Sequence, residues 1–177
     1  MVDVDAYVFV HAFEGRPSAV LGELIGTDGV RFAGRFVGSF VGFGAVVAPD
    51  LGTLQSRIDL DYWNVGVRSE WSVVVQPSDR EIPKRRSPDF CALVRIRSAG
   101  EVDAEALLGD LDRFYADTWE EVGYGAAVVT GSYDLLVELG GDSLEQLWDR
   151  VRDLRRQPGV GRTATAVAFL PGSALRS

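Results

Sequence analysis

The second half of this chain repeats the residue pattern of its first half. The tripeptide Gly38-Ser39-Phe40 corresponds to Gly131-Ser132-Tyr133, and the apolar positions of a following helical stretch correspond without a gap. Those positions are Leu51, Leu54 and Ile58 in the first half and Leu144, Leu147 and Val151 in the second. A duplicated unit predicts that one chain builds what a single-copy relative builds by dimerising. The alternative is a pair of independent units.

Both copies are predicted to have the element order β-α-β-β-α-β. In the first copy, apolar periodicity predicts strands over 6–13, 32–37, 41–48 and 71–76, and helices that begin near Pro17 and at Asp50. In the second copy, it predicts strands over 90–96, 124–129, 135–139 and 163–169, and helices that begin at Asp103 and Ser143. The predicted fold class is α+β, with two tandem ferredoxin-like βαββαβ units at 1–77 and 89–177. Residues 78–88 are rich in proline and charge and are predicted to be a linker.

In a βαββαβ unit both helices cover the same face of the sheet, so the other face must be buried in another way. Both rows of side chains in the strand at 6–13 are largely apolar, which predicts burial on both faces. Packing the two helix-free faces together would hide this surface and give an intramolecular, pseudo-dimeric α/β barrel. His11, Arg95 and Arg97 are the polar side chains expected between the sheets. We expect His11 to face solvent or to bond a neighbouring backbone group rather than to act in catalysis.

Composition excludes several classes of function. The net charge is −8, and the basic run Lys84, Arg85 and Arg86 is short, so direct nucleic-acid binding is not expected. Cys91 is the only cysteine, which excludes a disulfide framework and a thiolate metal cluster. The sequence shows no signal peptide and no stretch long and apolar enough to span a bilayer, so we expect no membrane association and a cytoplasmic location.

Two motifs in the second copy carry a resemblance to a known family. The run from Thr130 to Val137 contains Gly-Ser-Tyr-Asp, and Pro158-Gly159-Val160 precedes the last strand. Together they resemble the ligand-binding (effector) domain of the Lrp/AsnC family of transcription regulators, over residues 89–170. The resemblance implies a dimeric α/β barrel that binds an amino acid or a similar metabolite. The first copy departs from the pattern, since Val41 stands where the second has Asp134, and the early first strand leaves no room for a helix-turn-helix domain.

The candidate ligand-binding residues lie in the two turns and on one strand. In the turn of the second copy, the Asp134 carboxylate is expected to accept from a ligand's amino group, or to cap its own turn. Arg95 and Arg97 alternate on one strand, and a buried guanidinium would need a carboxylate such as Glu138 or Asp134, or an anionic ligand. The full predicted set is Gly131, Ser132, Tyr133, Asp134, Arg95, Arg97, Gly38, Ser39 and Phe40. No catalytic residues, metal site or cofactor are predicted.

The sequence favours a stand-alone regulatory module over an enzyme. This module would bind a small-molecule effector, a metabolite such as an amino acid, and act through association with itself or with DNA-binding relatives. The alternative is a cofactor-free enzyme of monooxygenase or isomerase type on the same barrel. A third possibility is a scaffold whose second interface serves assembly alone.

Overall fold

The computed structural model describes residues 3–12, 22, 25–26, 28–58, 67–78, 89–116 and 124–169. Two compact units, Met1–Val74 and Val75–Ser177, make up the chain. Residues 79–88 of the predicted linker and most of the helix predicted near Pro17 lie outside the described residues. The predicted domain boundaries therefore stay a prediction.

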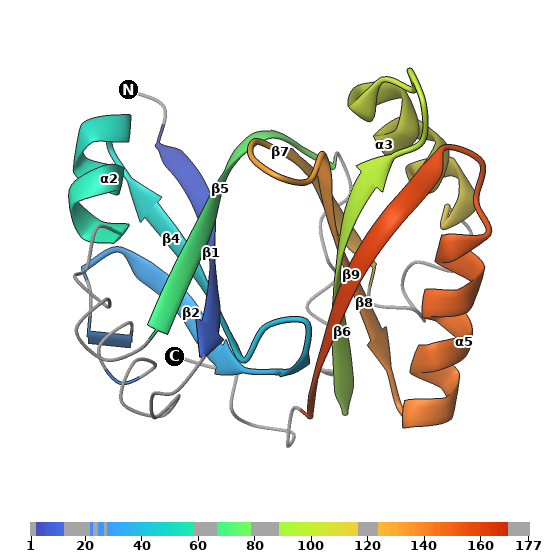
Figure 1. The fold of residues 1–177 in the computed structure, drawn as a ribbon, viewed down its shortest axis with the longest axis horizontal. Coiled ribbons are helices and arrows are strands. Elements are labelled where there is room, and N and C mark those ends of the chain that lie inside the picture. Colours follow the sequence, from blue (N-terminus) through green and yellow to red (C-terminus); the bar gives the residue numbers. More distant parts are fainter. Residues whose placement is uncertain are drawn as a thin grey trace. The chain divides into compact units, whose positions relative to one another are not determined.

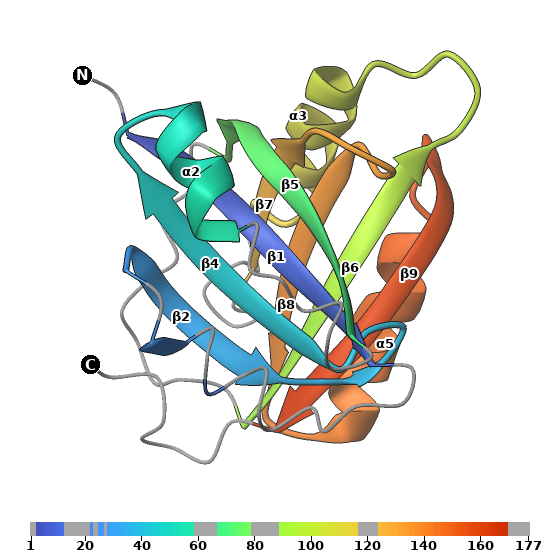
Figure 2. The same ribbon diagram turned by 60° about the vertical axis from the view of Figure 1, so that its left-hand side comes forward.

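The first unit is an antiparallel sheet with a helix packed on one face (Figures 1 and 2). Its elements are β1 (Val4–Ala12), β2 (Val30–Arg35), β3 (Val37–Gly38), β4 (Gly42–Ala48), α2 (Leu51–Ile58) and β5 (Val67–Pro77). Four of the strands follow the order β2-β4-β1-β5, and each neighbouring pair is antiparallel. On the helix side, Ala6 and Val8 of β1 pack with Val46, Ala48 and Leu54, all almost fully buried. Because side chains alternate along a strand, Tyr7, Phe9 and His11 lie on the opposite, helix-free face.

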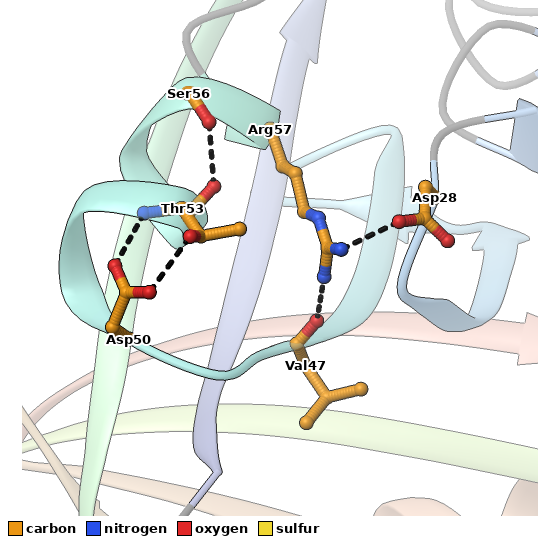
Figure 3. A network of polar contacts seen from close by, with 6 residues as sticks. All are labelled: Asp28, Val47, Asp50, Thr53, Ser56 and Arg57. Carbon is orange, nitrogen blue, oxygen red and sulfur yellow. Dashed lines mark hydrogen bonds and ion pairs between the residues drawn. The ribbon is translucent and has the colours of Figure 1, made fainter.

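Helix α2 begins at a side-chain cap, as predicted. The Asp50 carboxylate accepts from the backbone N–H and the hydroxyl of Thr53, each at 2.8 Å. These hydrogen bonds lower the pKa of Asp50. One turn further along, the Ser56 hydroxyl donates to the carbonyl of Thr53 (Figure 3).

Arg57 ties the end of α2 to the sheet and to the turn before β2. Its guanidinium donates to the Val47 carbonyl at 2.6 Å and pairs with Asp28 (Figure 3). Gly29 has a positive φ of 81°, and a Cβ there would collide with both the Val47 carbonyl and the Arg57 guanidinium. Glycine is therefore required at this position by conformation and by space.

The second unit is likewise an antiparallel sheet with its helices on one face (Figure 1). Its core is larger among the residues described. Its elements are β6 (Phe90–Ser98), α3 (Ala104–Phe114), β7 (Gly125–Val129), β8 (Leu135–Gly141), α5 (Leu144–Arg155) and β9 (Val160–Phe169). The strand order is β7-β8-β6-β9, again antiparallel. Asp103 and Ser143 cap α3 and α5 by accepting from the N–H groups of Ala106 and Gln146, as predicted.

Both helices of the second unit cover the same face of its sheet. Leu107, Leu108 and Leu111 of α3 and Leu147, Val151 and Leu154 of α5 are at most 2% exposed. They pack against the row Ala92, Val94 and Ile96 of β6 and the row Leu135, Val137 and Leu139 of β8. The helix-free face therefore carries Cys91, Leu93 and Arg95 of β6 together with Leu136 and Glu138 of β8.

These elements confirm the predicted α+β class with a mostly antiparallel arrangement of strands. Closure of the two helix-free faces into one barrel stays a prediction. Within the described residues, no helix has the length and apolar character needed to cross a membrane.

Candidate functional site

A histidine–carboxylate pair lies on the helix-free face of the first unit. His11 is at the end of β1, and Glu70 of β5 is the cross-strand partner of Phe9, two residues before it. Residues diagonal to each other on one face of a sheet are within reach of long side chains, so the carboxylate meets the imidazole. The Nε2 atom of His11 is 3.5 Å from Oε2 of Glu70. Their side chains are 22% and 24% exposed, so the pair is reachable from solvent.

Five aromatic rings on the same unit form a cluster beside this pair. This aromatic cluster consists of Tyr7, Phe9, Phe36, Phe40 and Phe43. Its members are linked by ring centroid distances of 5.1 Å to 5.9 Å, in stacked, tilted and edge-to-face arrangements. Phe9, which adjoins both His11 and Glu70 in the sheet, is 1% exposed. The rings give the pair a rigid apolar boundary on one side.

The pair has the chemistry of a reactive centre. A carboxylate beside an imidazole fixes which ring nitrogen holds the proton, and it stabilises the imidazolium that forms when histidine accepts another proton. The same arrangement orients histidines that bind metal ions. The pair can therefore transfer a proton or hold a metal-containing cofactor.

The helix-free face of the second unit carries an acid–thiol pair. The Cys91 thiol donates to Oε1 of Glu138 at 3.5 Å. Burial raises the pKa of both groups, and the neighbouring carboxyl raises the pKa of Cys91 further. Both groups therefore favour their protonated, neutral forms.

The structure brings three of the predicted ligand-binding residues together at the β7–β8 turn. Arg95 is 5% exposed, and its guanidinium lies 4.5 Å from the ring centroid of Tyr133. Oδ2 of Asp134 accepts from the backbone N–H and the hydroxyl of Ser98, at 2.8 Å and 2.7 Å. The Asp134 carboxylate thus bonds β6, whereas the sequence predicted a contact with a ligand's amino group or with its own turn. A ligand role for these residues stays a prediction.

The remaining predicted residues have different surroundings. Arg97 is exposed, unlike Arg95. Gly131 and Ser132 are exposed, and Gly131 has the positive φ expected of it, at 111°. Gly38 and Ser39 are exposed in the first unit, whereas Phe40 is buried in the aromatic cluster. Ligand binding at these positions is likewise untested.

Sequence reasoning missed Glu70 as a candidate. The strand was predicted to begin at Trp71, whereas β5 begins at Val67 and pairs with β1 along its first residues. Continuing the alternation backwards from Ser72 would have placed Glu70 on the face of Tyr7 and Phe9. Glu138 was considered as a partner for Arg95, but its carboxyl group accepts from Cys91. In the described part of the chain, no three His, Cys, Asp or Glu residues gather as a metal-binding group.

Comparison with known proteins identifies the fold. No family model matches the sequence, and no curated protein matches it. Among solved structures, a variant of chlorite dismutase from Candidatus Nitrospira defluvii in complex with cyanide aligns with 96% of this chain and 91% of its own, at 12% identity and a TM-score of 0.58. A second variant of that enzyme gives 11% identity and a TM-score of 0.56, covering 98% and 93%. A haem-binding protein from Thermus thermophilus gives 14% identity over 98% and 93%, but its TM-score of 0.48 is too low to support an inference.

These matches correct the interpretation drawn from the turn motifs. The resemblance to Lrp/AsnC effector domains is wrong, because the solved structures found to share the fold include chlorite dismutases and a putative chlorite dismutase. The predicted regulatory module with an amino-acid effector, its co-assembly with DNA-binding relatives and the exclusion of enzymatic activity are wrong with it. The chain has the fold of chlorite dismutase structures.

Proposed function

We propose that this chain is an enzyme that acts on a small molecule, with His11 and Glu70 as its reactive centre. The observation that carries the proposal is the 3.5 Å contact between Nε2 of His11 and Oε2 of Glu70, in a partly exposed pair beside the aromatic cluster. The fold supports it, since chlorite dismutases align with nearly the whole chain. The name of those enzymes suggests a small oxyanion as the first substrate to test.

Haem is the first cofactor to test, and His11 is the candidate ligand among the described residues that has a carboxylate partner. Iron in haem proteins is held by histidine, cysteine thiolate, methionine or tyrosine. His11 is the only histidine of the chain, and burial keeps the Cys91 thiol and the Tyr115 hydroxyl protonated by raising the pKa of each. His11 also has the carboxylate partner that iron-ligating histidines commonly have.

With haem bound, the chemistry supplied would be one-electron and oxygen transfer. The residues of this chain would hold and orient that group. His11 would supply the nitrogen ligand, and Glu70 would fix the ring orientation and increase the basicity of the imidazole. The aromatic cluster would keep water from one side of the site and lower the local dielectric constant.

Titration of the full chain with hemin, followed by absorption spectroscopy, tests this assignment. Saturable binding with a shifted Soret band is expected, and His11→Ala should abolish the shift. Glu70→Gln should weaken binding by about 10- to 100-fold, because it removes the charge that orients the ligand. Asp5→Asn, which changes a half-exposed carboxylate on the same strand that pairs with Arg31, is the control and should bind normally. Loss of chlorite from solution, measured by ion chromatography with the loaded protein, then tests the substrate.

A cofactor-free reaction at the same pair is the second candidate. The approach of the imidazole to the carboxylate is the arrangement of an oriented general base. Such a base could remove the proton of an aromatic hydroxyl group, and the resulting phenolate is readily oxidised by oxygen. Oxygen uptake with a naphthalene diol and no added cofactor measures this activity. Uptake that His11→Ala leaves unchanged would contradict a role for the pair.

The tandem barrel also remains a proposal. The large aromatic side chains on the helix-free face of the first unit support it, because a face of this kind is seldom left in water. Small-angle X-ray scattering of the chain in solution distinguishes a closed barrel from two separated units by its maximum dimension.

A further inference from the structure

A β-bulge in the second unit places two arginines opposite each other on neighbouring strands. The pairing of β6 with β9 shifts register just after Ile96, which pairs with Thr163. Two residues of β9, Gly161 and Arg162, then stand opposite the single residue Arg97. A Cβ at Gly161 would lie 2.7 Å from the Arg97 carbonyl oxygen, so glycine is needed for the strands to approach this closely. The bulge therefore aligns Arg162 with Arg97 across the strand pair.

Both arginines lie on the helix-free face of the sheet and are exposed. Ile96 is buried against the helices, so the alternation of side chains puts Arg97 on the other face. On β9, the Thr165 hydroxyl accepts from Arg155 of α5 at 3.0 Å, so Thr165 faces the helices. Arg162, an odd number of residues away on the same strand, faces the opposite side. The two guanidinium groups therefore share one accessible surface.

This arrangement brings like charges together without a carboxylate to balance them. Like charges at directly opposed positions of two strands repel each other. Other arginines of the second unit pair with the aspartate three residues before them: Arg113, Arg152 and Arg156. Within the described residues, the side chains of Arg97 and Arg162 form no hydrogen bond and no ion pair. Oδ2 of Asp134, at this end of β6, accepts from Ser98 instead.

The chemistry of the two side chains favours a phosphate group as the anion that they bind. A guanidinium group presents its N–H donors as a planar fork that fits the oxygens of phosphate. Two forks on neighbouring strands can contact different oxygens of one phosphate group, and their two positive charges match its charge of about −1.5 to −2 at pH 7. A carboxylate, with two oxygens, is satisfied by a single guanidinium. Arg95, two residues before Arg97 on the same face, adds a third positive charge nearby.

We propose that Arg97 and Arg162 bind a phosphate group, either inorganic phosphate or the phosphate of a small phosphate monoester, on the helix-free face of the second unit. The bound anion offsets the repulsion between the two guanidinium groups. The whole chain has a net charge of −8, so its overall field repels anions and the attraction is confined to this pair. The site is independent of His11 and Glu70, so the proposed reaction of the first unit can fail without affecting it.

Titration with inorganic phosphate, followed by phosphorus NMR at an ionic strength held constant with chloride, provides the first test. The wild-type chain should bind phosphate saturably. Arg97→Gln and Arg162→Gln should each weaken binding about tenfold or more, because charged hydrogen bonds to the anion are lost. Arg152→Gln is the matched control, since it removes the same charge from an exposed arginine that pairs with Asp149, and it should bind within about twofold of wild type. No saturable binding to wild type, or equal losses in all three variants, would overturn the proposal.

Two further ligands define the class of anion. Glycerol phosphate that binds more tightly than inorganic phosphate would identify a monoester as the ligand, and equal or weaker binding would identify inorganic phosphate. Acetate should bind at least about tenfold more weakly than phosphate, because it carries one charge and two oxygens. Acetate binding as tight as that of phosphate would refute the assignment to a phosphate group.

Thermal unfolding provides an independent test and shows whether the variants are folded. Without phosphate, the midpoint of Arg162→Gln should equal or exceed that of wild type, because the repulsion with Arg97 is removed. Added phosphate should raise the midpoint of wild type more than that of Arg162→Gln, since a ligand that binds the folded state stabilises it. A midpoint of Arg162→Gln below that of wild type without phosphate would show that Arg162 makes a stabilising contact, and it would contradict the proposed site.

Discussion

Two stacked tyrosines in the second unit differ in the hydrogen bonding of their hydroxyl groups. The rings of Tyr115 and Tyr124 are 4.6 Å apart and 23° from parallel, and both residues are almost fully buried. The Tyr124 hydroxyl donates to Asp112 at 2.8 Å, and Ser78 donates to the same oxygen at 2.9 Å. The Tyr115 hydroxyl is buried with no hydrogen-bond partner among the described residues. The two hydroxyls should therefore contribute differently to stability.

Phenylalanine at each position measures this difference. Tyr124→Phe removes a hydrogen bond to a carboxylate and should lower the free energy of unfolding by about 1 to 2 kcal/mol. Tyr115→Phe removes a polar group that bonds no described residue, so stability should stay within about 0.5 kcal/mol or rise. Urea unfolding followed by circular dichroism gives both values. A larger loss for Tyr115→Phe than for Tyr124→Phe would contradict the assignment.

The pKa of Glu138 makes stability depend on pH. Because burial raises this pKa, the folded state binds the proton more tightly than the unfolded chain does. The contribution of Glu138 is fully present below its ordinary pKa of 4.5 and is lost as the pH rises through the folded-state value. Thermal midpoints measured from about pH 5 to about pH 8 should fall less steeply for Glu138→Gln than for wild type. Parallel curves for the two proteins would show that Glu138 does not titrate in this range.

At the scale of elements, periodicity in the sequence predicted most of the fold. The second unit was predicted well because its apolar stripes are long and its caps are explicit, as at Ser143 and Asp103. The start of β5 was missed because Arg68, Ser69 and Glu70 interrupt the apolar run, although their backbone pairs with β1. Cross-strand pairing, which sequence alone does not reveal, decided both this boundary and the meeting of His11 with Glu70.

The cap of α5 gives a test at this scale. The Ser143 hydroxyl accepts from Gln146 N–H at 3.1 Å, and the Gln146 side chain accepts from Asp142 N–H at 2.9 Å. Ser143→Ala should cost about 1 kcal/mol, because an N–H group of the first turn loses its acceptor. Ser132→Ala, at an exposed turn residue, is the control and should change stability by less than about 0.5 kcal/mol. Equal effects in chemical denaturation would argue against the cap.

At the scale of the whole molecule, the turn motif serves the joining of strands in the sheet and misled about the family. Gly131 is needed for its positive φ, and Asp134 binds Ser98 of β6 through its carboxylate. Both are structural roles, because these residues connect strands in a sheet of this topology. Such residues can recur wherever the topology recurs, whatever the protein binds. The α+β class was therefore predictable from apolar periodicity, whereas the family could not be predicted from the motif.

The two units should differ in local stability. The core of the second unit contains fifteen buried residues in one cluster, whereas the helix-side core of the first has five among the residues described. Hydrogen exchange followed by mass spectrometry should therefore find the slowest amides in β6 and β8. Slower exchange in β1 and β4 would show that the aromatic cluster of the first unit outweighs this difference.

The single thiol of the chain, on Cys91, allows local opening of the second unit to be measured. It lies on β6, which is flanked by β8 and β9, and it is 4% exposed. Because the thiol is buried, an alkylating reagent can reach it only when the structure around it opens, so the rate of labelling reports how often this part of the second unit opens. Alkylation of Cys91 thus measures the rate of local opening without an engineered label.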